Sequence, residues 1–133
     1  MKKFNLIIFI DDDEATNFYH KIVAELAGVS KEVIFYQKAS EALEFYKNLT
    51  KEDQLPEIIF LDINMPRIDG WEFLEQFSKI EMEERPIIFM VSTSLNQRDL
   101  DKAEEHPLVA RFIQKPVTED QLIALRKEIL LQD

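Results

Sequence analysis

Short, almost purely apolar runs recur along the chain and predict five buried strands. Each run is rich in Ile, Val or Phe, is too short for a helix, and mostly lacks the apolar–polar alternation of a strand with one face in water. Strands that are covered on both faces have this pattern. The runs are Asn5–Ile10, Val33–Tyr36, Ile58–Leu61, Ile87–Val91 and Ala110–Ile113.

Longer amphipathic stretches follow these runs and predict five helices. In the first, an i, i+3, i+4, i+7 rhythm predicts a core-facing stripe, and Gly28 is expected to end the helix. The fifth is expected to open with a capping box between Thr118 and Gln121. The apolar positions are Tyr19, Ile22, Val23 and Leu26 in the first helix, Ala39, Ala42, Leu43 and Tyr46 in the second, Phe73, Phe77 and Ile80 in the third, a weakly apolar Gln97–Glu105 in the fourth, and Leu122, Leu125 and Ile129 in the fifth.

This strict strand–helix alternation predicts an α/β fold. Short connections between alternating strands and helices are typical of a parallel sheet with helices on both faces. A longer polar loop is expected at Lys51–Pro56, before the third strand. With 133 residues, the chain is expected to form one domain, residues 1–133, without an output domain after the fifth helix.

Composition narrows the classes of function. Sixteen basic against 26 acidic residues give a net charge of −10, which argues against direct nucleic-acid binding, because that binding depends on neutralising phosphates. The chain has no cysteine and only two histidines, far apart in the sequence, so a zinc site is not expected. No apolar segment has the length of a membrane span. The expected location is the cytoplasm.

Polar residues with complementary chemistry follow four of the predicted strands. Asp11 and Asp12 follow the first, Asp62 the third, Ser92 and Thr93 the fourth, and Lys115 the fifth. In open parallel sheets, ligands bind beyond the carboxyl ends of the strands. Each residue alone has an ordinary structural explanation, since Asp caps helices and Ser caps turns. Asp13 and Glu14 are assigned that role, at the start of the first helix.

Taken together, the strand-end residues indicate phosphoryl chemistry. Asp11, Asp12 and Asp62 would repel one another if they met, and a Mg²⁺ ion, which prefers oxygen ligands, would remove that repulsion. A carboxylate such as Asp62 can act as a nucleophile and form an aspartyl phosphate. Lys115 would then neutralise charge on the transferred group, and Ser92 would donate a hydrogen bond to it.

The motifs "IDDDE", "LDINMPRIDGWEFL", "MVSTS" and "FIQKP", in this order, resemble the receiver domain of two-component response regulators, of the stand-alone chemotaxis-regulator kind. The resemblance covers essentially the whole chain. It implies a flavodoxin-like (βα)₅ fold, doubly wound, with five parallel strands in the order 2-1-3-4-5. It also implies that Asp62 is the phosphoacceptor, and that Mg²⁺ is held by Asp11, Asp12, Asp62 and the backbone carbonyl of Asn64.

The resemblance assigns the remaining site residues as well. Lys115 matches the lysine that pairs with the phosphoryl group, and the Lys115–Pro116 peptide bond is expected to be cis. Ser92 matches the switch hydroxyl, with Thr93 as a competitor, and Phe112 matches the aromatic switch residue. The implied partners are a histidine kinase or histidine phosphotransfer protein and an unknown downstream protein. The downstream protein would bind the face formed by the fourth helix, the fifth strand and the fifth helix.

Two other functions are compatible with a strand-end aspartate. A haloacid-dehalogenase-type phosphatase also uses one with Mg²⁺, but it needs a second acid two residues later, where this chain has Asn64. A binding module that is never phosphorylated would not need the complete set of acceptor-site residues. His20 is expected on a helix surface, and Trp71 is expected to be half-buried at the start of the third helix, near Asp62.

Overall fold

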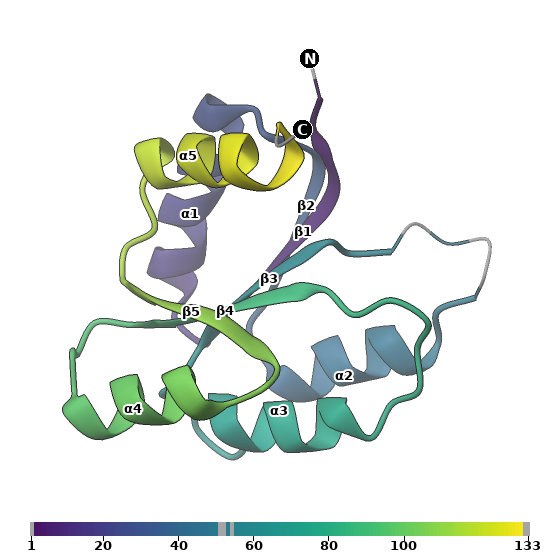
Figure 1. Cartoon of the computed structure of the whole chain (residues 1–133), viewed down its shortest axis with the longest axis vertical. Coiled ribbons are helices and arrows are strands. Elements are labelled where there is room, and N and C mark those ends of the chain that lie inside the picture. The colour runs from purple at the N-terminus through teal and green to yellow at the C-terminus, as the bar shows by residue number, and fades with distance from the viewer. Residues whose placement is uncertain (1, 51–52, 54, 132–133) are drawn as a thin grey trace.

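The five strands form one parallel sheet in the order β2-β1-β3-β4-β5, as predicted. Figure 1 shows the computed structural model, which describes residues 2–50, 53 and 55–131. Each strand begins and ends within a few residues of the predicted apolar run. The strands are β1 (Phe4–Ile10), β2 (Ser30–Tyr36), β3 (Ile58–Asp62), β4 (Ile87–Ser92) and β5 (Val109–Gln114).

A helix follows every strand, which confirms the predicted element order. Gly28 ends the first helix in the left-handed conformation, with φ 60°, and a capping box between Thr118 and Gln121 opens the fifth. The helices are α1 (Glu14–Ala27), α2 (Ala39–Lys47), α3 (Gly70–Ser78), α4 (Gln97–Glu105) and α5 (Glu119–Leu130). Three residues of the predicted loop Lys51–Pro56 lie outside the described residues, and the other three lie outside helix and strand.

The sheet divides the core into two layers. Helices α1 and α5 cover one face, and α2, α3 and α4 cover the other (Figure 1). Because strand side chains alternate between faces, Phe60 packs under α1 and α5 while Ile59 packs on the α2 and α3 side. Phe60 stacks on Phe9 and on Phe89, with ring centroids 4.7 and 5.4 Å apart. The central strands are therefore covered on both faces, as their composition indicated.

Helix α1 turns a different face to the core from the one predicted. Its buried residues are Asn17, His20, Val23 and Ala24. Of the predicted stripe only Val23 is buried, whereas Leu26 is 66% exposed and Tyr19 and Ile22 are also exposed. Asn17 and His20 point inward because each forms a hydrogen bond with a backbone group there. Asn17 donates to the carbonyl of Asp11, and His20 accepts from the amide of Val117. Hydrophobic periodicity cannot detect such partners.

Helix α4 is the helix least embedded in the core. Ala103 is its one buried residue, and Leu100 and Asp99 are partly exposed. Trp71 of α3, half-buried as predicted, donates its indole N–H to the Asp99 carboxylate at 3.3 Å. The Lys102 ammonium lies 4.9 Å from the Trp71 ring centroid. Helix α4 is thus held by the buried Ala103 and, in addition, by a hydrogen bond and a cation–π contact with Trp71 of α3.

Replacing Tyr46 by phenylalanine is expected to stabilise the fold. The Tyr46 ring is buried edge-on against Phe77, with centroids 4.9 Å apart, but its hydroxyl has no hydrogen-bond partner among the described residues. Burial accordingly raises the pKa of this phenol. Removing an unpartnered buried hydroxyl should add about 1 kcal/mol to the free energy of unfolding in urea. Tyr36→Phe, at a partly exposed position, is the control and should change it little; a loss of stability in Tyr46→Phe would contradict this account.

Within the part of the chain that the structure covers, no helix has both the length and the apolar character needed to cross a bilayer.

Candidate functional site

Three carboxylates meet at the carboxyl edge of the sheet, as the sequence predicted. Asp62 is the last residue of β3, and Asp11 and Asp12 directly follow β1, its neighbour in the sheet. One oxygen from each of the three lies within 4.8 Å of the others. Asp11 and Asp62 are buried, whereas Asp12 is exposed. Two of the acids therefore lie within the fold and the third at its opening to solvent.

The start of α1 fixes the position of Asp11. The backbone N–H of Asp13 donates to Asp11 Oδ1 at 2.9 Å, and the Asn17 side-chain amide donates to the Asp11 carbonyl oxygen at 2.8 Å. Asp13 itself is the N-cap residue of α1, as predicted. Its carboxylate accepts a hydrogen bond from the Thr16 hydroxyl, which lowers the pKa of Asp13. Asp13 thus belongs to the helix start and not to the acidic cluster.

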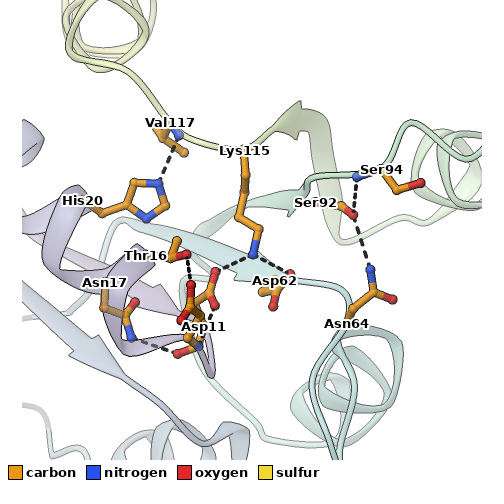
Figure 2. A network of polar contacts seen from close by, with 11 residues as sticks. Asp11, Thr16, Asn17, His20, Asp62, Asn64, Ser92, Ser94, Lys115 and Val117 are labelled. Atoms are coloured by element: carbon orange, nitrogen blue, oxygen red, sulfur yellow. Dashed lines mark hydrogen bonds and ion pairs between the residues drawn. The ribbon is translucent and has the colours of Figure 1, made fainter.

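Lys115 lies between the two buried acids (Figure 2). Its Nζ is 2.8 Å from Asp11 Oδ2 and 3.3 Å from Asp62 Oδ1. The Lys115 backbone N–H donates to the Ser92 carbonyl oxygen at 2.8 Å, which holds the end of β5 against the end of β4. The peptide bond from Lys115 to Pro116 is cis, which confirms the prediction. Burial disfavours the charged ammonium, but the hydrogen bond to Asp11 and the charge of Asp62 outweigh burial and raise the pKa of Lys115.

The environment of Asp62 makes its ionised form costly. Burial is the main cause, the neighbouring charge of Asp11 adds to it, and the contacts with Lys115 oppose it, so that the pKa of Asp62 rises to about 6. The contacts with Lys115 therefore do not fully offset burial and the charge of Asp11 together. A further positive charge at this position would lower the free energy of the ionised cluster.

The donor set of the cluster suits a hard divalent cation. All three side chains offer carboxylate oxygens, the ligand type that Mg²⁺ prefers, and Asp12 is exposed to solvent. Oxygens bound to a single Mg²⁺ lie roughly 3 to 4 Å apart, given metal–oxygen distances of about 2.1 Å. The oxygens of the cluster, within 4.8 Å of one another, need only a small contraction to reach that geometry. The acidic cluster could thus hold a metal ion.

The two candidate switch hydroxyls differ in their surroundings. Ser92, the last residue of β4, is fully buried, and its Oγ accepts hydrogen bonds from Asn64 Nδ2 at 3.4 Å and from the Ser94 backbone N–H at 3.2 Å (Figure 2). Thr93 is exposed. Ser92 is therefore in direct contact with the loop that follows Asp62, which favours Ser92 over Thr93 as the switch hydroxyl. The choice between them stays a prediction.

Phe112 lies on β5 next to β4, paired in register with Met90. Its ring is partly exposed and packs against the apolar layer on the α2, α3 and α4 side of the sheet. Ser92 and Gln114 are paired in the same register, so Lys115 directly follows the residue beside Ser92. Ser92 and Lys115 thus lie at neighbouring strand ends, and Phe112 lies on β5 two residues before its last residue, Gln114.

Gly70 determines how closely α3 approaches the acidic cluster. Its backbone N–H donates to the Ile63 carbonyl oxygen at 2.9 Å. A Cβ atom at this position would lie 2.7 Å from the Asp62 carbonyl oxygen and 3.0 Å from Ile63 Cα. Both contacts are with backbone atoms of the strand end that carries Asp62, so they cannot relax by a side-chain rotation.

Gly70→Ala is expected to displace Asp62 and to slow any reaction that depends on it by roughly tenfold or more. The chain offers a matched control in its other glycine. Gly28 has φ +60°, and a Cβ atom added to it would have no neighbour within 4 Å, so Gly28→Ala should cost about 1–2 kcal/mol of stability through backbone strain and leave the site unchanged. Phosphorylation rates and urea unfolding of both variants test this prediction. Equal rates in both variants would contradict it.

Two residues that contact the site, Asn17 and His20, were missed from the sequence. His20 was expected on the helix surface, but it is 2% exposed. That prediction was wrong because it followed the more hydrophobic stripe of α1. One feature of the sequence could have indicated that these two side chains are buried. Asn17 and His20 are three residues apart, and Ala24 continues the same helix face one turn later.

Comparison with known proteins identifies the family. Residues 7–127 match the model of the response regulator receiver domain. The chain therefore belongs to the response regulator receiver domain family, whose members are signalling domains of two-component systems.

Similar proteins support this assignment. An uncharacterized response regulatory protein of Vibrio cholerae is 32% identical over 126 residues, which is 94% of this chain and 48% of that protein. A protein-glutamate methylesterase/protein-glutamine glutaminase of Rhodopseudomonas palustris is 30% identical over 101 residues, 76% of this chain and 26% of that protein. The chain thus spans less than half the length of these curated relatives.

Solved structures agree on the fold. The crystal structure of a two-component response regulator from Cytophaga hutchinsonii superposes with a TM-score of 0.88 at 30% identity, covering 98% of this chain and all of that one. A response regulator receiver protein from Dyadobacter fermentans gives a TM-score of 0.82 at 25% identity, covering 92% of this chain and 95% of that one. This chain is a CheY-like receiver domain with a flavodoxin-like fold.

Proposed function

We propose that Asp62 accepts a phosphoryl group and that the chain thereby acts as a switch in two-component signalling. Receiver domains are phosphorylated by histidine kinases or histidine phosphotransfer proteins. The observation that carries the assignment to Asp62 is its buried position between Asp11, Asp12 and Lys115 at the carboxyl edge of the sheet. Asp62 is the only one of the three acids that is itself part of the strand, at the centre of the sheet.

Mg²⁺ is the proposed cofactor. Asp11, Asp12 and Asp62 would hold it through carboxylate oxygens and Asn64 through its backbone carbonyl. When bound, the ion supplies positive charge that offsets the negative charge of the transferred group. The raised pKa of Asp62 supports this proposal, because burial and the charge of Asp11 disfavour the ionised carboxylate more than Lys115 favours it.

The chemistry that the chain's own residues perform is simple. A carboxylate oxygen of Asp62 forms the new bond to phosphorus as the bond from phosphorus to the imidazole nitrogen of the donor breaks, and the bonding electron pair leaves with that nitrogen. Lys115, now 3.3 Å from Asp62 Oδ1, is placed to pair with an oxygen of the transferred group. Ser92 Oγ exchanges its contact with Asn64 for a hydrogen bond to another phosphoryl oxygen.

The new charge biases a conformational equilibrium. A phosphoryl group adds about −1.5 to −2 charge and draws Ser92 and Lys115 toward Asp62. Movement of Ser92 frees space that the partly exposed Phe112 ring can enter. Helix α4 follows most readily because Ala103 is its one buried residue. The face formed by α4, β5 and α5 changes shape, and we propose that a downstream protein binds there.

The chain acts in this proposal as a phosphoacceptor and not as a phosphatase of other molecules. A haloacid-dehalogenase-type phosphatase needs a proton-donating acid two residues after the nucleophile. Asn64 occupies that position, and its amide instead donates to Ser92. This contact supports a switch rather than general acid catalysis.

Intact mass after incubation with acetyl phosphate and Mg²⁺ tests the proposed function. The natural sequence should gain the mass of one phosphoryl group, and Asp62→Asn should gain none. Chelation of the metal should prevent the gain. Absence of any mass gain in the natural sequence would contradict the proposal. Sustained hydrolysis of small phosphate esters, dependent on Asp62, would indicate a phosphatase instead.

Trp71 offers a measurement of the switch itself. Its indole N–H contacts Asp99 and its ring lies beside Lys102, both on α4. Movement of α4 should alter both contacts, so the emission of Trp71, the single tryptophan, is expected to change when beryllofluoride and Mg²⁺ are added. The same addition to Asp62→Asn is the control and should leave the emission constant. Unchanged emission in the phosphorylatable protein would contradict the proposed movement of α4.

A further inference from the structure

Asn17 and His20, one turn apart on α1, each form a hydrogen bond to the backbone near one partner of the Asp11–Lys115 ion pair. Asn17 Nδ2 donates to the Asp11 carbonyl oxygen at 2.8 Å. His20 Nε2 accepts a hydrogen bond from the Val117 backbone N–H at 3.0 Å. Figure 2 shows both contacts on the side of the site that α1 covers. The same helix face therefore holds the backbone next to each partner of the ion pair.

The turn from β5 to α5 has few backbone groups with which to attach to its surroundings. The Lys115 N–H is bonded to the Ser92 carbonyl, and Pro116 has no N–H. The Thr118 N–H is bonded within the capping box of α5, to Gln121 Oε1 at 2.9 Å. The Val117 N–H lies between these groups in a fully buried residue. Its bond to His20 is thus the backbone contact that fixes this turn to the helix α1.

The ring of His20 is oriented for that contact. It is buried and stacks on Phe9 of β1, with ring centroids 4.9 Å apart and an interplanar angle of 27°. Burial lowers the pKa of His20 to about 4, so the ring is neutral at pH 7. Because Nε2 accepts, the proton lies on Nδ1, which has no partner among the residues that the structure describes. A phenylalanine would make the same stack without that cost, so the acceptor is what the histidine contributes.

We infer that His20 is a positioning residue for phosphoryl transfer, which holds the β5–α5 turn so that Lys115 Nζ lies between Asp11 and Asp62. The inference rests on the proposed function. Lys115 is fixed on one side by the Ser92 carbonyl and, two residues later, by His20. Loss of the second attachment lets the lysine move away from the phosphoryl group. Because a displacement of about 1 Å can cost up to about a hundredfold in rate, a loss of roughly tenfold is expected.

Two substitutions separate the acceptor from the ring. His20→Phe keeps the stack on Phe9 and removes the acceptor, whereas His20→Gln loses the stack and retains an acceptor oxygen at a similar distance along the side chain. His20→Phe should lower the rate constant for phosphoryl gain from acetyl phosphate about tenfold. Its Mg²⁺ affinity, measured by the rise in unfolding midpoint with added Mg²⁺, should stay within about twofold, because the metal ligands lie on other elements. His20→Gln should recover most of the rate.

A double-mutant cycle tests whether the effect passes through the lysine. If His20 acts by placing Lys115, then His20→Phe should cost little further rate in a Lys115→Ala background. Additive losses would overturn the inference, as would a rate for His20→Phe equal to that of the natural sequence, or equal losses in His20→Phe and His20→Gln. If the natural sequence itself gains no phosphoryl mass, the proposed function fails instead, and the two failures are thus distinguishable.

A measurement on the unaltered protein tests the hydrogen bond between His20 Nε2 and the Val117 N–H, even if a variant does not fold. Imidazole nitrogen chemical shifts should show an unprotonated Nε2 and a protonated Nδ1 at neutral pH, with a scalar coupling from Nε2 to the Val117 amide. A proton on Nε2 would overturn the inference, because the ring could then not accept from Val117.

Discussion

Asp62→Asn is expected to give a protein that gains no phosphoryl mass and is nevertheless more stable than the natural sequence at neutral pH without Mg²⁺. The loss of phosphorylation follows from removal of the proposed nucleophile. The gain in stability follows from the electrostatics of the site, where burial and the charge of Asp11 raise the pKa of Asp62 from its ordinary value of 3.8 to about 6. The amide keeps the shape of the side chain and removes its charge.

The pH dependence of this gain has a definite sign. Because the pKa of Asp62 is raised in the folded state, the folded protein binds this proton more tightly than the unfolded chain does. The destabilising contribution of Asp62 is therefore absent below about pH 4, grows between about pH 4 and 6, and is complete above about pH 6. The shift of about two units corresponds to roughly 3 kcal/mol at most, and a difference of about 1–3 kcal/mol between the two proteins is expected at about pH 7.5.

Urea unfolding at several pH values checks this prediction. The matched control is Glu104→Gln, which removes the same charge from an exposed position on α4 and should change stability by less than about 0.5 kcal/mol. Added Mg²⁺ should stabilise the natural sequence more than Asp62→Asn, so that the gap narrows. A variant less stable than the natural sequence at neutral pH, or a gap independent of pH, would contradict the proposed origin of the destabilisation.

Lys115→Met should have the opposite effect on stability. In Mg²⁺-free buffer the substitution leaves Asp11 and Asp62 without the ammonium that lies 2.8 and 3.3 Å from them. Breaking a buried ion pair by removing one partner costs several kcal/mol, and a loss of about 2–4 kcal/mol is expected here. Methionine retains most of the volume of the side chain, so lost packing contributes little.

Mg²⁺ should separate the two roles of Lys115. With the competing lysine removed, Mg²⁺ should bind the variant at least as tightly as it binds the natural sequence and restore much of the lost stability. Phosphoryl gain from acetyl phosphate should still fall by a factor of about 10², since no ammonium remains to pair with the transferred group. Lys21→Met, at an exposed position of α1, serves as control. Weaker Mg²⁺ binding together with a normal phosphorylation rate would show that these roles are wrongly assigned.

Most of the fold and the composition of the site could be predicted from the sequence because each depends on local signals. The central strands are apolar on both faces, and the residues after them lie at one edge of any parallel sheet, which places Asp11, Asp62 and Lys115 at the same edge. The strand order that brings them close together was implied by the family resemblance. The cis bond before Pro116 followed from the family resemblance and not from the residues themselves. The absence of an output domain stays a prediction.

The contacts that required tertiary information could not be predicted in the same way. The burial of Asn17 and His20 depends on two backbone groups, at Asp11 and Val117, that lie far apart in the sequence. Hydrophobic periodicity evaluates a helix alone and therefore favoured the more apolar stripe, whose last member, Leu26, is 66% exposed. The tight approach of Gly70 to the Asp62 carbonyl likewise depends on how α3 docks on β3.

The shallow attachment of α4 has an evolutionary consequence. With Ala103 as its one buried residue, most positions of this helix can be exchanged at a cost to the fold of less than about 0.5 kcal/mol each. Gene duplicates of such a receiver can therefore diverge on α4 without losing their folded state. If a downstream protein binds the proposed face of α4, β5 and α5, substitutions on this helix would change which partner is bound, while the acidic cluster and Lys115 stay the same.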